Sequence, residues 1–162
     1  MNKKTYISLD GYNNLIIELN SKKEQEKEVY KLISESRERE MGGDTENTEL
    51  QALLVERVTV REQIASIELF CSTVNVIDLD GLPEHNGKVR FGSSVTLLDY
   101  QTNKPIKYTI LGERESDLKN HIVSYSSPIG QAMLNNSVGD VICIEAPKGL
   151  LEFEILDISK KI

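Results

Sequence analysis

Hydrophobic residues in the first half of the chain recur at the spacing of helices. They return at steps of three and four residues over residues 9–40 and again over residues 46–71, which is the period of an amphipathic α-helix. The sequence therefore predicts two long helices. Their apolar positions are Tyr12, Leu15, Leu19, Val29 and Ile33 in the first helix and Leu50, Leu53, Leu54, Ile64, Ile67 and Cys71 in the second.

Two adjacent glycines separate the predicted helices. Gly42 and Gly43 favour the end of the first helix, and Asp44 or Thr45 can cap the start of the second. Because the connection is short, the two helices are expected to pack side by side in opposite directions. The sequence thus predicts an antiparallel two-helix coiled coil over residues 1–78, with its tip near residues 40–49.

Hydrophobic residues in the second half alternate with polar ones, which is typical of half-buried strands. Ser127 followed by Pro128 signals the start of a helix, because serine caps a helix and proline fits its first position. Residues 79–162 are therefore predicted to form a small antiparallel sheet with one short helix, which makes the whole chain an α+β protein. The expected strands lie near residues 89–97, 106–110, 122–125, 141–145 and 151–158.

The charge balance and the cysteines exclude several classes of protein. The 162 residues include 26 acidic and 19 basic side chains, for a net charge of −7, which argues against a protein that coats nucleic acid. No apolar run approaches the length of a membrane span, and no secretory leader follows the first lysines. Cys71 and Cys143 lack the spacing of a metal site and are expected to be reduced thiols. We expect a cytoplasmic protein, monomeric when free, that binds no membrane.

Carboxylates gather at the predicted tip, where Asp44, Glu46 and Glu49 follow the two glycines. Carboxylate oxygens suit Mg²⁺, which proteins usually hold through one or two carboxylates plus oxygens from elsewhere. Two interpretations stay open: half of a Mg²⁺ site that a partner completes, or a solvated charged loop. Arg37 likewise contacts phosphate or pairs with a nearby glutamate.

No catalytic machinery of the chain's own is visible. The sequence has no serine–histidine–acid or cysteine–histidine arrangement, and the glycine pair at 42–43 lacks the lysine of a phosphate-binding loop. The tip carboxylates are therefore the main candidates for chemistry.

Segments spread over the whole chain match one pattern. They are residues 9–12, 35–38 and 46–49 in the first half and 77–78, 89–97, 108–112, 124–130, 138–140, 149 and 152–155 in the second. In order and spacing these segments resemble the Gre transcript-cleavage factors of bacteria, the GreA type more than the more basic GreB type. The likeness covers nearly the whole chain and depends on the combination of segments.

The resemblance implies a fold and a function. Gre factors have an N-terminal antiparallel coiled coil and a C-terminal domain similar to FK506-binding proteins, an FKBP-like domain. That domain binds RNA polymerase at the rim of its secondary channel, and the coiled coil enters the channel. There the tip carboxylates help to hold a Mg²⁺ ion while the polymerase cuts the 3′ end of backtracked RNA. The resemblance therefore implies a transcription elongation factor that stimulates the polymerase and is no enzyme by itself.

The resemblance also assigns roles to residues of this sequence. Asp44 and Glu46 become the catalytic carboxylates, which share Mg²⁺ with the polymerase only in the complex, and Glu49 becomes a reserve ligand. Arg37 is expected to contact the RNA 3′ end or the polymerase. The residues expected in the polymerase-docking domain are Ser127 and Pro128.

The tip departs from the pattern of the family, which typically reads Gly-Asp-x-x-Glu. Here Asp44 stands two residues before Glu46, so on a helix the two would not share a face, and Leu50 stands where the family usually has an aromatic residue. One alternative is therefore a Gre-like regulator that occupies the channel and inhibits the polymerase without cleavage. Two alternatives come from other classes: an FKBP-like prolyl isomerase or chaperone, which the lack of tryptophan disfavours, and a coiled-coil adaptor.

Overall fold

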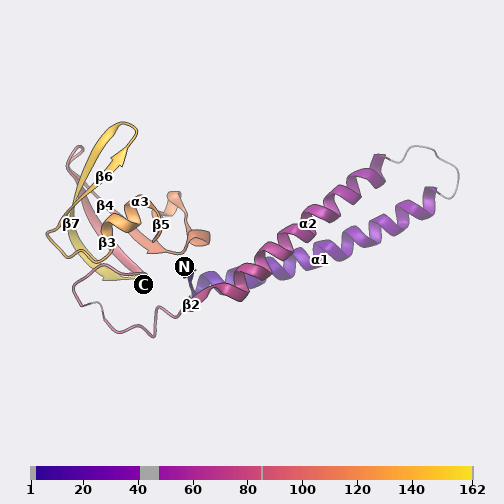
Figure 1. Cartoon of the computed structure of the whole chain (residues 1–162), viewed down its shortest axis with the longest axis horizontal. Helices are drawn as coiled ribbons and strands as arrows, with labels where there is room; N and C mark the ends of the chain where they lie inside the picture. Colours follow the sequence, from indigo (N-terminus) through magenta and orange to yellow (C-terminus); the bar gives the residue numbers. More distant parts are fainter. Residues whose placement is uncertain (1–2, 41–47, 85, 162) are drawn as a thin grey trace. The chain divides into compact units, whose positions relative to one another are not determined.

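The chain forms two compact units in a computed structural model that describes residues 3–40, 48–84 and 86–161. One unit, Tyr12–Val74, is helical, and the other combines Met1–Gly11 with Asn75–Ile162 and contains the strands (Figure 1). We call them the helical unit and the sheet unit. This division differs from the expected one at residues 78 and 79, because a strand before the helices pairs with a strand after them.

Two long helices make up the helical unit: α1 (Leu9–Glu40), whose first residues belong to the sheet unit, and α2 (Thr48–Thr73). They run antiparallel, because residues early in α1 pair with residues late in α2. Lys23 Nζ lies 3.0 Å from a carboxylate oxygen of Glu68, and Arg39 Nη1 lies 3.4 Å from one of Glu49. The predicted antiparallel helix pair is thus confirmed. A cluster of buried apolar side chains joins the helices towards the chain reversal: Val29, Ile33, Leu50 and Leu53.

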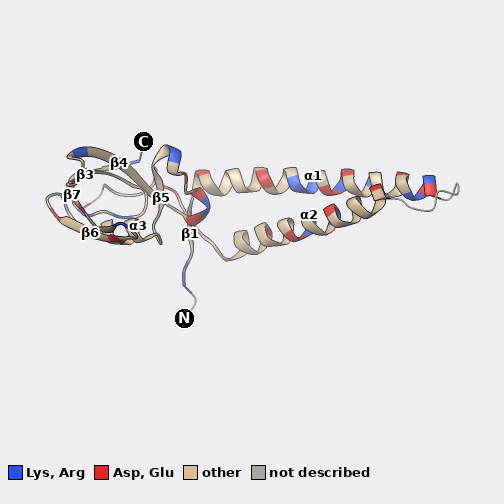
Figure 2. Ribbon diagram, turned by 90° about the horizontal axis from the view of Figure 1, so that it is seen from above, with Lys and Arg blue, Asp and Glu red and all other residues tan. Residues whose placement is uncertain are grey.

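The middle of the helix pair is more polar than the predicted apolar positions indicate. The Arg57 guanidinium lies 5.7 Å from the centre of the Tyr30 ring, and Arg61 donates a hydrogen bond of 3.4 Å to the Tyr30 hydroxyl. Acidic and basic residues alternate along both helices (Figure 2). None of the described helices is long and apolar enough to cross a membrane.

Five strands form the main sheet of the sheet unit, in the order β5-β4-β3-β7-β6. Most neighbours are antiparallel, but β4 and β5 are parallel, so the sheet is mixed and the prediction of an antiparallel sheet is wrong on this point. Two short 3₁₀ helices, η1 (Glu113–Glu115) and η2 (Leu118–Asn120), carry the chain back before β5. The strands are β3 (Ser93–Asp99), β4 (Lys104–Leu111), β5 (Ile122–Ser124), β6 (Val141–Ala146) and β7 (Gly149–Lys160).

The strand expected over residues 89–97 begins only at Ser93. Gly92 has a φ of +84°, in the left-handed region that favours glycine, and so turns the chain just before β3. Upstream of this turn, the Val89 amide donates a 2.9 Å hydrogen bond to the Asn136 carbonyl, away from the sheet ladder. Apolar alternation therefore continues here across a break in the strand.

One face of the main sheet packs against α3 (Pro128–Met133). Met133 from this helix is fully buried with Leu97 and Ile155 of the sheet. The Ser127 hydroxyl caps the helix as predicted: it accepts from the Gly130 amide at 3.1 Å and donates to the Ser124 carbonyl at 2.7 Å. The core of the sheet unit thus lies between the sheet and this one short helix.

A second sheet has two strands, one before the helices in the sequence and one after them. The strand β1 (Tyr6–Ser8) pairs in parallel with β2 (Asn75–Ile77). The Glu115 carboxylate holds β1 in the sheet unit: it accepts from the amides of Ser8 at 3.1 Å and Gly112 at 2.9 Å, and from the Ser8 hydroxyl. The Tyr125 hydroxyl accepts from the amide of Tyr6 at 3.3 Å. The N-terminal strand is therefore fixed by side chains that lie more than 100 residues away.

The cap at Ser127 provides a test of the role of this residue in the fold. Ser127→Ala is expected to lower the free energy of unfolding of the sheet unit by about 1 kcal/mol, because the Gly130 amide loses its acceptor. Ser127→Thr keeps the hydroxyl and should stay close to the wild type. Urea denaturation followed by tyrosine fluorescence measures both, and equal losses in the two variants would contradict a capping role.

The carboxylate of Glu115 allows a second test. Glu115→Ala is expected to lower the free energy of unfolding of the sheet unit by about 2 kcal/mol, since the buried Ser8 amide is left without its acceptor. Glu84→Ala, an acidic side chain in an exposed loop, is the matched control and should change stability by less than about 0.5 kcal/mol. Equal midpoints of the two variants in urea would show that Glu115 does not anchor β1.

Candidate functional site

The end of the helix pair is the first candidate site. α1 ends at Glu40 and α2 begins at Thr48, so the connection joins two helix ends that lie at the chain reversal (Figure 1). Asp44 and Glu46, the two predicted catalytic carboxylates, lie in this connection and fall outside the described residues. Glu49 lies in the first turn of α2 and is exposed.

Arginine side chains accompany the acidic residues in the last turn of α1. Arg39 contacts both carboxylate oxygens of Glu49, at 3.4 and 3.5 Å, and its Nε donates to the Glu35 carbonyl at 3.3 Å. Arg37 is exposed, and no carboxylate of the described residues lies within 4.0 Å of it. The sequence favours Arg37 over its neighbours for a contact with phosphate, whereas the structure shows that Arg39 is the residue that pairs with Glu49.

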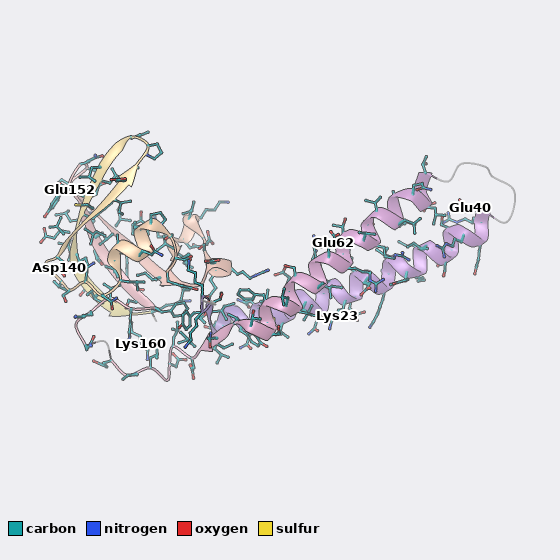
Figure 3. All side chains as sticks on the ribbon, viewed as in Figure 1. Lys23, Glu40, Glu62, Asp140, Glu152 and Lys160 are labelled. Atoms are coloured by element: carbon teal, nitrogen blue, oxygen red, sulfur yellow. The ribbon has the colours of Figure 1, made fainter. Side chains whose placement is uncertain are left out.

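Packing in the same turn explains which side chains point outward. Ser36 is fully buried, one turn beyond the buried Ile33. Helical geometry then turns the residues on either side of Ser36 towards solvent, and Glu35 and Arg37 are both exposed. Glu40 lies at the very end of α1 (Figure 3). The helix pair therefore presents acidic and basic groups together at its end.

The metal-binding capacity of the described residues is limited. They contain no group of three or more histidine, cysteine, aspartate or glutamate side chains that could hold a metal ion. Glu49 forms an ion pair with Arg39, which neutralises part of its negative charge. Carboxylates remain the donor type that Mg²⁺ prefers, and one or two of them suffice when other oxygens complete the shell. The donor chemistry of the tip sequence thus fits a Mg²⁺ site that oxygens from elsewhere complete.

The second candidate site surrounds the start of α3. Both hydrogen bonds of the Ser127 hydroxyl are used within the cap, whereas Pro128 is exposed. Beside them, the Ser126 hydroxyl donates to a carboxylate oxygen of Glu113 at 2.6 Å. The exposed ring of Pro128 is therefore available for a contact with another molecule, while Ser127 serves the fold.

The loop that contains η1 and η2 adds a feature that the sequence analysis missed. Leu118 is 81% exposed, which is high for a leucine. Asp117 caps η2 and accepts a hydrogen bond of 2.7 Å from the Asn120 amide, which lowers the pKa of this carboxyl group. The charged form of Asp117 is thus favoured next to an exposed apolar side chain.

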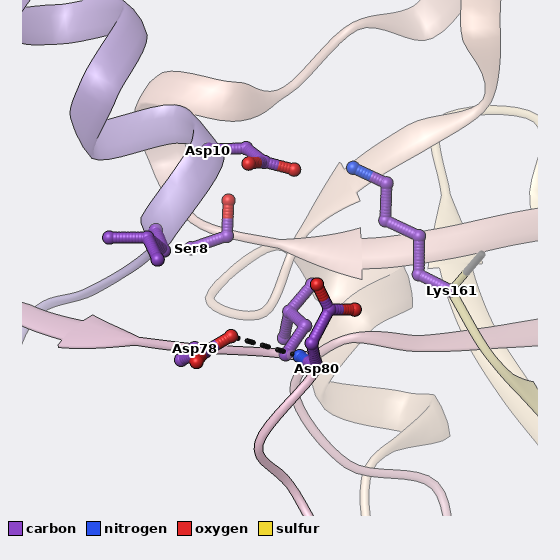
Figure 4. A pocket seen from close by; sticks show the side chains of 7 residues that line it. Ser8, Asp10, Asp78, Asp80 and Lys161 are labelled. Carbon is purple, nitrogen blue, oxygen red and sulfur yellow. Dashed lines mark hydrogen bonds between the residues drawn. The ribbon is translucent and has the colours of Figure 1, made fainter.

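A small cavity of about 90 Å³ lies in the sheet unit near the start of α1. In Figure 4 the carboxylate of Asp10 and the ammonium group of Lys161 face each other across it. The Asp80 amide donates to the Asp78 carboxylate at 3.0 Å, which ties one acidic side chain of the lining to the backbone. These carboxylates belong to no metal-binding group of the described residues.

Comparisons with known proteins identify the family. A model described as "Transcription elongation factor, GreA/GreB, C-term" matches residues 84–160. The chain is 33% identical to the transcription elongation factor GreA of Chloroherpeton thalassium over 99% of its own length and 100% of that protein. It is 36% identical to GreA of Maridesulfovibrio salexigens, covering 94% of this chain and 92% of that protein.

One of the solved structures it resembles is GreA factor homolog 1 of Thermus thermophilus, at 27% identity and a TM-score of 0.43 over 97% of this chain and 99% of that one. The full-length similarity to the two GreA proteins, together with the family model on the C-terminal half, shows that the chain belongs to the GreA/GreB family of transcription elongation factors.

Proposed function

We propose that this chain binds bacterial RNA polymerase, inserts its helix pair into the secondary channel and stimulates the polymerase to cleave backtracked RNA. The single observation that carries the proposal is the chain reversal between Glu40 and Thr48, because it puts the acidic connection at the end of two long antiparallel helices. Family membership supports the choice of polymerase as the partner.

The dimensions of the helix pair support insertion into a channel. α1 has 32 residues, so at about 1.5 Å per residue it is roughly 48 Å long. Two packed helices, each about 10–12 Å in diameter, make an arm roughly 20 Å wide. Such an arm reaches a buried active centre from the surface of a large enzyme.

The proposed chemistry belongs to the connection between the helices. Asp44 and Glu46 would hold Mg²⁺ together with groups of the polymerase, and Glu49 would be the reserve ligand. When bound, Mg²⁺ lowers the pKa of a coordinated water and neutralises charge on the phosphate. The carboxylates of this chain would help to orient a water towards the backbone phosphate of the RNA, while the polymerase would provide the rest of the site. The chain therefore stimulates a nuclease without being one.

Basic residues near the tip complete the proposal. Arg39 is occupied by Glu49, which leaves the exposed Arg37 to contact a phosphate near the RNA 3′ end or the polymerase. The sheet unit docks at the rim of the channel through the start of α3, where Pro128 is exposed and Ser127 keeps the helix in place.

Two observations at the tip favour a second candidate function. Asp44 precedes Glu46 by two residues, and Glu49 is paired with Arg39. Both reduce the number of carboxylates that can converge on one ion. In the alternative, the chain occupies the secondary channel and inhibits the polymerase without cleavage.

Cleavage of RNA in a stalled, backtracked elongation complex of the cognate polymerase tests the proposal. The wild type is expected to cleave, and Asp44→Ala and Glu46→Ala are expected to lower the cleavage rate about 100-fold or more, the typical loss when one group that stabilises the transition state is removed. Glu49→Ala should have a smaller effect. The matched control is Glu62→Ala, an exposed glutamate in the body of α2 (Figure 3), which should cleave like the wild type.

Binding of each variant to the same complex separates the two functions. Binding without cleavage by the wild type, together with slower nucleotide addition, would replace the cleavage factor with the inhibitor. No binding by the wild type would contradict both. If the three tip variants all cleave like the wild type, the tip carboxylates have no part in the reaction.

A further inference from the structure

The face of the main sheet opposite α3 carries a separate surface, which we call the outer face. Core residues such as Leu97 and Ile155 point towards α3, so their neighbours along each strand point the other way. One row across the outer face runs through four strands, since Val141 is paired with Glu154, Glu154 with Leu98, and Leu98 with Pro105.

A second and a third row extend the outer face along β6 and β7. Cys143 is paired with Glu152, and Glu145 with Leu150. The Tyr100 amide donates to the Glu152 carbonyl at 3.2 Å, so Tyr100 follows β3 along the same rows. Figure 3 shows Glu152 on the side of the sheet away from α3. The outer face is thus a continuous surface built from β3, β4, β6 and β7.

Apolar side chains on the outer face are unusually open to solvent. Val141 is 49% exposed, Leu150 is 54% exposed and Tyr100 is 45% exposed. Single exposed apolar residues need no explanation, but several on adjoining strands form the kind of patch that marks an interaction surface.

Three carboxylates lie between these apolar side chains: Glu145, Glu152 and Glu154. Among the described residues, no lysine or arginine nitrogen lies within 4.0 Å of any of these three carboxylates. The four ion pairs that the described residues form all belong to the helical unit. The Tyr100 hydroxyl donates to Glu154 at 2.9 Å, and this hydrogen bond raises the pKa of Tyr100. A basic residue of the same face, Lys107, lies on β4, two strands away from β7. The centre of the outer face is therefore negatively charged.

This charge selects the kind of partner. Phosphate groups of nucleic acids and anionic lipids would be repelled by the three carboxylates. A protein segment with lysine or arginine would neutralise them, and its apolar side chains would cover the exposed valine and leucine. We infer that the outer face binds a cationic, amphipathic segment of a protein partner, with basic side chains over Glu152 and Glu154 and apolar ones over Val141 and Leu150.

A short fluorescent peptide that alternates lysine with valine is the probe. Fluorescence anisotropy with the full chain measures its affinity, and the same peptide with glutamate in place of lysine is the control ligand. The native Cys143 reports the location of binding: in a Cys71→Ala background, bound peptide should slow the reaction of Cys143 with a maleimide several-fold. The lysine peptide is expected to bind and the glutamate peptide is not.

Paired variants distinguish the outer face from the overall negative charge. Glu152→Gln with Glu154→Gln should weaken binding about tenfold, the effect expected from losing two exposed charge contacts. Glu18→Gln with Glu28→Gln removes the same charge from exposed positions of α1 and should change the affinity less than twofold. Equal weakening by the two pairs, no protection of Cys143, or equal binding of the glutamate peptide would each overturn the inference. It does not depend on cleavage, so its failure leaves the proposed function untouched.

Discussion

The parallel pairing of β1 with β2 is the constraint on which the rest of the structure depends. The helical unit is a segment of the chain that leaves the sheet unit after Gly11 and must return at Asn75. An antiparallel helix pair needs both of its open ends close together, and this pairing holds them: the Asn75 amide and side chain both donate to the Thr5 carbonyl, at 2.8 and 3.1 Å. Three residues per strand are too few to be stable alone. Burial of Ile7 and the hydrogen bonds of Ser8 to Glu115 therefore stabilise the connection.

Between its two ends the helix pair is joined by apolar contacts and by charge. Buried residues occur near the start of α1, at Leu15 and Leu19, and again at Val29 and Ile33. The charged stretch between them is bridged by side chains of the other helix, as in the pair of Lys23 with Glu68. Exposed ion pairs of this kind contribute less than about 1 kcal/mol each. The apolar clusters therefore stabilise the arm, while the charged side chains keep its long surface polar.

The sequence predicted the features that repeat over many residues and missed those that depend on distant partners. Helical periodicity extends over dozens of residues, so the two helices and their antiparallel order could be predicted, and the Ser127 cap is a local signal. Alternation does not encode strand direction, so the parallel pairing of β4 with β5 could not be predicted. The strands β1 and β2 are too short to have a pattern. The pairing of Arg39 with Glu49 was not predicted, because it follows from the register of the two helices, which depends on where each helix ends.

The distribution of charge is a further case in which the structure changes what the sequence indicates. By formal charge the first half of the chain is the acidic one, with 16 acidic against 10 basic residues, while the second half is nearly balanced. In the folded chain, however, the ion pairs of the described residues lie in the helical unit and neutralise part of its acidity. Glu152 and Glu154 lie beside exposed apolar side chains and have no such partner there. Carboxylates that a partner can neutralise are therefore found on the sheet as well as at the tip, because a partner responds to the local field and not to the net charge of a half.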